Sequence, residues 1–288
     1  MQYVIGKTSR LGNRTINQDR IAALERDNTV LLVLGDGLGG RTGGELAAQV
    51  LVDTVAQQFQ QASLPIQNPK EFMTSALHRA HFSVIDAGEC HEPPLNPGTT
   101  AVLCLVQDGQ AWWAHVGDSR LYLFRGSVPI YRTKDHSYVE SLYQKGELSH
   151  DKRSTHPLRN YMTRCIGLSE GVPEVTVSNA VVLHPGDILM LCSDGLWEPI
   201  DEMEMGMKII DGRLNDAMEL LSLEAEEKSY PSSDNTSGVA IQIMSLQLVG
   251  RAIPDEIEKQ VNQASKLDPV QSAIDVIEQT FKLYKDEM

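Results

Sequence analysis

The order of strand-like and helix-like segments is the feature that most constrains how this chain can fold. Seven apolar runs rich in β-forming residues are predicted as strands: 30–34, 99–106, 111–116, 120–124, 181–183, 188–192 and 238–244. Two helical segments follow the first run, and a helical pattern returns near 215–228. Turn sequences at 107–110 and 184–187 suit short links between antiparallel strands. Strands clustered in this way favour an α+β domain in which helices pack outside antiparallel sheets.

The two helical segments after the first strand carry recognisable start signals. One is predicted to begin at Thr42, where the sequence T-G-G-E fits a capping box closed by Glu45. The other takes Asn68 as its N-cap, Pro69 as its first residue and Glu71 as the partner of the cap. Both segments then place apolar residues at helical spacing, so each is expected to cover a sheet with one face.

Composition and charge exclude several classes of protein. The 288 residues are 41% hydrophobic and 22% charged, as in ordinary globular proteins. The formal net charge of −14 would repel nucleic acids and anionic membranes, so no nucleic-acid partner is expected. The chain has no apolar run long enough to span a membrane and no leader pattern at its start, which predicts a cytoplasmic protein. Four cysteines without metal-ligand spacing are expected as reduced thiols in or near the core: Cys90, Cys104, Cys165 and Cys192.

The pattern changes near the C-terminus, which predicts a main domain over residues 1–248 and a helical extension over 249–288. Asp268 and Pro269 resemble the cap and first residue of a helix, and apolar residues follow at spacings of three and four. Two readings are open for this extension. It packs back on the main domain, or it binds a partner or a second copy.

The loop at 35–40, with the sequence GDGLGG, matches the G-x-G-x-x-G pattern of dinucleotide sites. Three features argue against that reading. Asp36 would place a negative charge between the glycines that approach a pyrophosphate. The acidic residue expected about twenty positions later would be Asp53, which the helical pattern places inside a helix. The elements that follow are also not those of a βαβ unit.

Aspartates recur at the ends of the predicted strands, and this repetition explains the loop better. The five are Asp19, Asp36, Asp118, Asp194 and Asp234. A single aspartate at a strand end is usually a turn residue. Five carboxylates gathered at one end of a sheet would repel one another and take up protons unless cations neutralised them. Ligands that are all oxygen suit Mg²⁺ or Mn²⁺, and two such ions ~4 Å apart can clamp a phosphoryl group.

Eight ordered motifs then give a specific resemblance. They are RTINQD (14–19), GDGLGGRTGG (35–44), GTTAV (98–102), AHVGDSRLYL (114–123), TKDHS (133–137), TRCIG (163–167), GDILMLCSDGLWE (186–198) and DNTSGVA (234–240). The chain resembles the metal-dependent protein serine/threonine phosphatases of the PPM or type 2C family, in their compact bacterial form. The resemblance implies four αββα layers, with a central antiparallel β-sandwich flanked by helix pairs. It assigns residues 1–248 to the phosphatase domain and leaves 249–288 outside.

The resemblance also implies roles for the aspartates. Asp36 would bridge two Mn²⁺ or Mg²⁺ ions, and Gly37 would lend its backbone carbonyl to one of them. Asp194 and Asp234 would hold the other ion, while Asp19 would act nearby, mainly through metal-bound water. These roles agree with the chemistry expected of hard cations and oxygen ligands.

Three further assignments follow from the same resemblance. Arg14 matches the arginine that binds the substrate phosphate, a task suited to its bidentate fork. Asp118 matches a residue that helps to hold a third ion in many relatives, and residues 136–167 match a variable flap beside the site. The implied reaction is hydrolysis of phosphoserine and phosphothreonine on proteins by direct attack of a metal-bridging water. Its expected partners are phosphorylated proteins, a cognate Ser/Thr kinase and that kinase's targets.

One departure and two rival hypotheses remain. Many eukaryotic relatives have a histidine at the position of Leu38, which protonates the leaving oxygen, and leucine cannot do so. Metal-bound water is then the first candidate donor and His136 the second. A catalytically silent module that binds phosphorylated partners would be expected to lose Arg14 or a metal aspartate, and all are present. An adaptor function of the tail would be separated from simple docking by truncation near residue 248.

Overall fold

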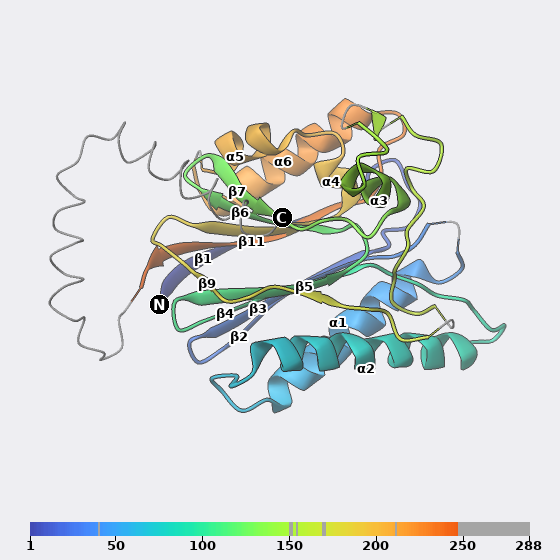
Figure 1. Ribbon diagram of the computed structural model, residues 1–288, viewed down its shortest axis with the longest axis horizontal. Helices are drawn as coiled ribbons and strands as arrows, with labels where there is room; N and C mark the ends of the chain where they lie inside the picture. The colour runs from blue at the N-terminus through green and yellow to red at the C-terminus, as the bar shows by residue number, and fades with distance from the viewer. Residues whose placement is uncertain (40, 150–151, 154, 169–170, 211, 247–288) are drawn as a thin grey trace, which may run out of the picture. The chain divides into compact units, whose positions relative to one another are not determined.

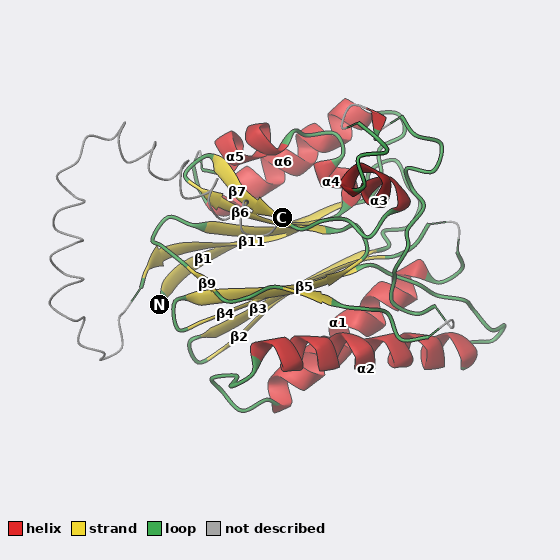
Figure 2. Ribbon diagram, viewed as in Figure 1, coloured by secondary structure: helices red, strands yellow, loops and turns green. Residues whose placement is uncertain are grey.

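Two β-sheets stacked face to face form the centre of the protein, and helices cover both outer faces (Figure 1). The computed structural model describes residues 1–246 except 40, 150–151, 154, 169–170 and 211. Residues Met1–Leu246 form one compact unit. The four layers run helix, sheet, sheet, helix (Figure 2), which confirms the predicted α+β fold of αββα type.

Both sheets are antiparallel throughout. The first has the order β1-β11-β10-β6-β7, and its strands are β1 (Gln2–Arg10), β11 (Thr236–Ser245), β10 (Ile188–Cys192), β6 (Arg120–Arg125) and β7 (Val128–Arg132). The second has the order β2-β3-β4-β5-β8, and its strands are β2 (Asp19–Arg26), β3 (Thr29–Asp36), β4 (Ala101–Gln107), β5 (Gln110–Val116) and β8 (Thr176–Val177). A short strand, β9 (Val181–Val182), also pairs with β5.

Helices are divided between the two outer faces and the end of the sandwich. The pair α1 (Gly44–Gln61) and α2 (Pro69–Glu89) covers the second sheet, and the pair α5 (Glu202–Ile209) and α6 (Leu214–Ser229) covers the first (Figure 1). Two short helices, α3 (Tyr138–Gln144) and α4 (Asp194–Trp197), belong to the segments that follow β7 and β10.

The unbroken apolar run in β3 follows from its place between two packed layers. Leu31 and Val33 pack toward α1 and α2, whereas Val30, Leu32 and Leu34 pack into the space between the sheets. Successive side chains of a strand point to opposite faces, so a strand covered on both faces needs apolar residues at every position. The run was readable as a strand for this reason.

The start of α1 differs from the prediction. The capping box at Thr42 is wrong, because the N-cap residue is Gly43 and no side chain caps the helix. Gly43 has a left-handed backbone with φ of 89°, a conformation that favours glycine and turns the chain into the helix without a side-chain acceptor. The prediction for α2 is confirmed, since the side chain of Asn68 accepts a hydrogen bond from the backbone N–H of Glu71.

The predictions for the cysteines are confirmed in part. Cys104, Cys165 and Cys192 are buried free thiols, but Cys90 is exposed just beyond α2, so its predicted core position is wrong. The predicted helix beyond Asp268 lies outside the described residues, and the boundary at 248 stays a prediction. Within the described part of the chain, no helix is long and apolar enough to cross a membrane.

Candidate metal centre and phosphate site

A cavity of about 750 Å³ opens where the strands that carry the predicted aspartates end. Six of the seven predicted site residues line it: Arg14, Asp36, Gly37, Asp118, Asp194 and Asp234. The seventh, Asp19, is the first residue of β2 and is buried directly opposite Asp36, the last residue of β3, in the antiparallel register. The fold therefore brings together all the residues that the sequence singled out.

The backbone around Asp36 is fixed by hydrogen bonds from the start of β4. Asp36 donates its N–H to Oγ1 of Thr100 at 3.0 Å, and its carbonyl accepts the N–H of Thr100 at 2.8 Å. The hydroxyl of Thr99 donates to the same carbonyl at 2.9 Å. With its main chain held on both sides, Asp36 presents its carboxylate at a defined place in the cavity wall.

Gly37 occupies a position where a side chain does not fit. A Cβ atom there would lie 2.3 Å from the carbonyl oxygen of Gly44 and 2.9 Å from that of Gln18. The backbone of β3 thus passes very close to the first turn of α1 as it leaves the sheet. Glycine is required at this point for packing, whatever else its carbonyl does.

Burial and mutual repulsion raise the pKa of four of the aspartates. Burial, and then the neighbouring carboxylates, raise the pKa of Asp36 and Asp194 well above the ordinary value. Burial raises the pKa of Asp19 to about 7, although the hydroxyl of Ser193 opposes the shift. Burial raises the pKa of Asp118 to about 6, and nearby Asp135 adds to the effect. Such a cluster favours either bound protons or bound cations.

The chemistry of the donors fits a bound cation. Oδ2 of Asp19 accepts a hydrogen bond from the hydroxyl of Ser193 at 2.8 Å, whereas its buried Oδ1 has no hydrogen-bond partner among the described residues. An orphaned carboxylate oxygen inside an all-oxygen cluster fits a hard divalent ion. In the described ranges, no three acidic, histidine or cysteine side chains meet closely enough to enclose an ion alone. A complete ligand shell therefore needs carbonyl or water oxygens as well.

Arg14 and Asp234 form an ion pair across the mouth of the cavity, which the sequence did not predict. Nη2 of Arg14 lies 2.7 Å from Oδ2 of Asp234, and the two side chains are 52% and 41% exposed. The other oxygen of Asp234 accepts the N–H of Asn235 at 2.8 Å. The guanidinium is thus held at the cavity but remains accessible to an incoming anion.

His136 does not fit the role of proton donor that was considered for it. Its Nδ1 accepts the N–H of Gly117 at 3.2 Å, and its Nε2 bonds to the hydroxyl of Thr176 at 2.9 Å. Burial, helped by adjacent His115, lowers the pKa of His136 to about 3, so the ring is neutral at physiological pH. No histidine is among the described residues that line the cavity, but Leu38 is. The structure therefore gives no support to His136, the second of the two candidate donors.

A buried network beside Asp118 went unrecognised in the sequence. Arg120 donates two hydrogen bonds to the carboxylate of Asp135, at 2.8 and 2.7 Å. Its guanidinium also lies 3.4 Å from the ring centroid of Trp197, and the indole N–H of Trp197 donates to the carbonyl of Asp118 at 3.1 Å. All three side chains stand inside the quoted motifs, but nothing in the motifs indicates that they touch.

Comparison with known proteins identifies the family. The family described as "Protein phosphatase 2C" matches residues 7–221. This chain belongs to that family.

Curated and solved relatives agree. The serine/threonine phosphatase stp of Listeria monocytogenes is 29% identical over 240 residues, covering 82% of this chain and 94% of the relative. The crystal structure of Stp1 from Staphylococcus aureus is 27% identical with a TM-score of 0.77, covering 85% of this chain and 96% of that one. The catalytic domain of PstP, solved in complex with two manganese ions, is 25% identical with a TM-score of 0.71, covering 84% of this chain and 99% of that one.

The predicted class of enzyme is confirmed by these relatives. The chain is a metal-dependent serine/threonine phosphatase of the 2C type, and phosphoproteins are its class of substrate. The matched region includes six of the seven predicted site residues, and Asp234 lies just beyond it. The role of each residue in this phosphatase is a separate question.

Proposed function

We propose that this phosphatase hydrolyses phosphoserine and phosphothreonine on proteins at a centre of two Mn²⁺ or Mg²⁺ ions. The observation that carries the proposal is the cluster of carboxylates with raised pKa values around one cavity, together with the buried Oδ1 of Asp19, which has no partner among the described residues. When bound, such ions supply the charge that polarises a phosphoryl group and acidifies a water molecule.

Each ligand has a distinct position in the proposed centre. Asp36, at the end of β3, would hold the ions together with the carbonyl of Gly37. Asp194, in the first turn of α4, and Asp234, just before β11, would complete the same centre. Asp19 would act beside them through water, and Asp118 would help to hold a further ion.

Arg14 is proposed as the group that binds the substrate phosphate. Its guanidinium lines the cavity and is half exposed while paired with Asp234. A phosphate dianion offers this fork two acceptor oxygens, so it competes well with the single oxygen of Asp234. Charge on the phosphoryl oxygens in the transition state would strengthen the same contact.

The leaving oxygen must be protonated without a histidine. Leu38 cannot donate a proton, and His136 is neutral and lies outside the described lining of the cavity. We assign the proton to a water molecule of the centre. Because a serine or threonine alkoxide is a poor leaving group, we expect protonation of the leaving oxygen to limit the rate of the reaction.

The cellular setting is proposed from the type of reaction and from the sequence pattern of the chain. A cognate Ser/Thr kinase in the cytoplasm would phosphorylate the target proteins, and this enzyme would remove those phosphate groups. Residues 1–248 are proposed as the catalytic domain, and 249–288 as a helical extension that docks on the domain or on a partner.

The experiment measures hydrolysis of a phosphothreonine peptide and an aryl phosphate, with Mn²⁺ and with a chelator. Wild type should lose activity on chelation, and Asp194→Asn should lose roughly 100-fold or more at saturating Mn²⁺ because a charged ligand is gone. Asp53→Asn is the matched control, since Asp53 is an exposed aspartate within α1. Activity that survives both chelation and Asp194→Asn would refute the two-ion centre.

A further inference from the structure

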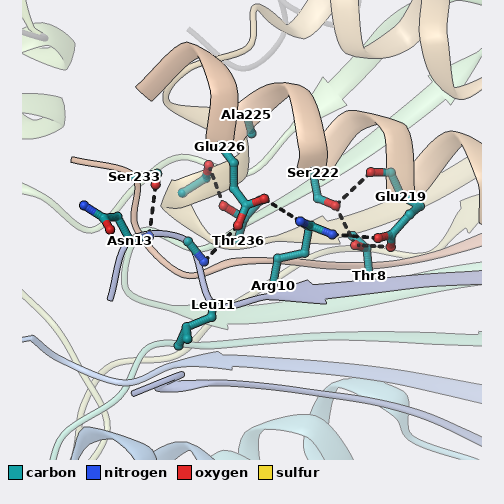
Figure 3. A network of polar contacts seen from close by, with 12 residues as sticks. Thr8, Arg10, Leu11, Asn13, Glu219, Ser222, Ala225, Glu226, Ser233 and Thr236 are labelled. Atoms are coloured by element: carbon teal, nitrogen blue, oxygen red, sulfur yellow. Dashed lines mark hydrogen bonds and ion pairs between the residues drawn. The ribbon is translucent and has the colours of Figure 1, made fainter. Parts of the chain in front are cut away.

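The loop that carries Arg14 is fastened to α6 by a carboxylate. Glu226 of α6 accepts the backbone N–H of Gly12 through Oε1 at 2.9 Å and the Nε–H of Arg10 through Oε2 at 2.6 Å. Figure 3 shows Glu226 reaching from the helix to the end of β1 and the chain beyond it. None of the sequence motifs contains Glu226, and the catalytic proposal does not use it.

The other side of this loop, at Gly12 and Asn13, packs against residues 233–234, just before β11. Gly12 has φ of +61°, and a Cβ there would lie 2.1 Å from the carbonyl oxygen of Asp234. The N–H of Asn13 donates to the carbonyl and to the hydroxyl oxygen of Ser233, each at 3.0 Å (Figure 3). Gly12 and Asn13 are therefore held between α6 and residues 233–234, immediately before Arg14.

A second glutamate on α6 shares only part of these contacts. Glu219 accepts from Nη1 of Arg10 at 2.9 Å and from the hydroxyl of Thr8 at 3.0 Å, as Figure 3 also shows. Both carboxylates thus pair with the same arginine, but only Glu226 also holds Gly12. The side chain of Glu226 is 20% exposed and that of Glu219 is 47% exposed. A charge-assisted bond is screened less at the more buried position.

We infer that Glu226 is a positioning residue for phosphate binding, which acts by holding the Gly12 backbone so that Arg14 stays beside Asp234 and the cavity. The inference rests on the proposed role of Arg14. An arginine side chain loses rotational freedom about several bonds when it binds an anion. A mobile backbone two residues away adds conformational entropy that binding must also remove. Losing the Gly12 bond therefore weakens phosphate binding, although the partners of the Glu226 side chain are Arg10 and Gly12 and neither is a proposed ligand of the ions.

The test compares variants by the inhibition constant of inorganic phosphate and by KM and kcat for a phosphothreonine peptide. Glu226→Ala should weaken phosphate inhibition and raise KM by roughly fivefold, with a smaller change in kcat. Glu226→Gln keeps a neutral acceptor for Gly12 and should recover most of the loss. Glu219→Ala, which also removes a partner of Arg10, should stay within about twofold of wild type. The Mn²⁺ concentration for half-maximal activity should not change in any of them.

The decisive comparison is made in an Arg14→Ala background. There Glu226→Ala should have no further effect on phosphate inhibition, because the residue through which it acts is gone. An effect that persists in that background, or equal effects of Glu219→Ala and Glu226→Ala, would overturn the inference and leave the catalytic proposal standing. If Arg14→Ala itself leaves phosphate inhibition unchanged, the proposed role of Arg14 fails and this inference falls with it.

Folding is controlled in the same series. Circular dichroism and the melting temperature show whether Glu226→Ala keeps the native fold. If it does not, Glu226→Asp replaces it, because aspartate keeps the charge but is shorter by one methylene and withdraws from Gly12. Loss of phosphate affinity in folded Glu226→Asp supports the inference, and unchanged affinity overturns it.

Discussion

At the scale of single residues, Leu38 places an apolar side chain in the wall of the cavity. Its N–H donates to the carbonyl of Gly98 at 2.9 Å, so its backbone is fixed where the loop passes the cavity. Its side chain is packed against Gly98, where an added Cβ would lie 2.9 Å from Cδ1 of Leu38. An apolar group therefore occupies this place in the cavity lining.

Leu38→His should speed hydrolysis of the phosphothreonine peptide by roughly tenfold and change aryl phosphate hydrolysis much less. An alkoxide needs a proton to leave, whereas a phenolate leaves without one. The measurement is the ratio of kcat for the two substrates at saturating Mn²⁺. Leu38→Ala, which also removes the leucine side chain but adds no acid, is the control. Equal changes for both substrates would show that protonation does not limit the reaction.

At the scale of elements, a buried ion pair joins β6 to the segment that leads into α3. Arg120 and Asp135 are 9% and 6% exposed at their side chains, and the bidentate bond between them satisfies both charges. Arg153 reaches the same region, with an ion pair to Glu140 of α3 at 2.9 Å. Arg153 also lies 3.9 Å from Asp135, so these charged groups link α3 and residue 153 to β6 beside Trp197.

Asp135→Ala should lower the free energy of unfolding by about 3–5 kcal/mol, because it leaves the guanidinium of Arg120 buried without its carboxylate partner. Urea titration followed by circular dichroism measures the change. The control is Arg213→Ala, which breaks an ion pair to Asp216 at a side chain that is 87% exposed and should cost within about 0.5 kcal/mol. Similar values for both variants would contradict the account of the buried pair.

Strands could be predicted from the sequence where both faces of the strand are buried. β3 and β10 are buried at nearly every position and stand out as apolar runs. β1, β2 and β7 were missed, because their half-exposed faces mix polar and apolar residues. Four of the five carboxylates could be found because each lies at an end of a predicted strand, whereas Asp19 begins β2, which was missed. Contacts such as that of Glu226 with Gly12 join residues 214 positions apart, and no local pattern encodes them.

At the scale of the whole molecule, the fold concentrates negative charge in one buried place. Burial raises the pKa of Asp19 to about 7 and that of Asp118 to about 6, so the metal-free folded state binds protons that the unfolded chain has released. Their contribution to stability is greatest below about pH 4, near the ordinary pKa of an aspartate, and is lost as pH rises toward 7. Divalent ions remove this penalty by neutralising the carboxylates.

The difference in melting temperature between Mn²⁺-saturated and chelated protein should therefore grow from pH 5 to pH 8. Burial lowers the pKa of His81, His115 and His136, so their contribution to stability changes with pH in the opposite sense. Because this contribution is present with and without Mn²⁺, it cancels when the difference is taken at each pH. Asp194→Asn should reduce the difference, because it removes both a repelling charge and a proposed ligand. A difference that is constant with pH would contradict the assignment of these carboxylates to the ions.

The pairing of β1 with β11 has a consequence for the newborn chain. Among the described strands, β1 pairs with β11 alone. Asn235, at the entry to β11, donates to the carbonyls of Leu11 and Ile16 and accepts the N–H of Gln18. A ribosome makes β1 some 230 residues before its partner β11. Until then residues 11–18, which carry Arg14, lack their contacts with Asn235, so we expect dephosphorylation to begin only after β11 has been synthesised.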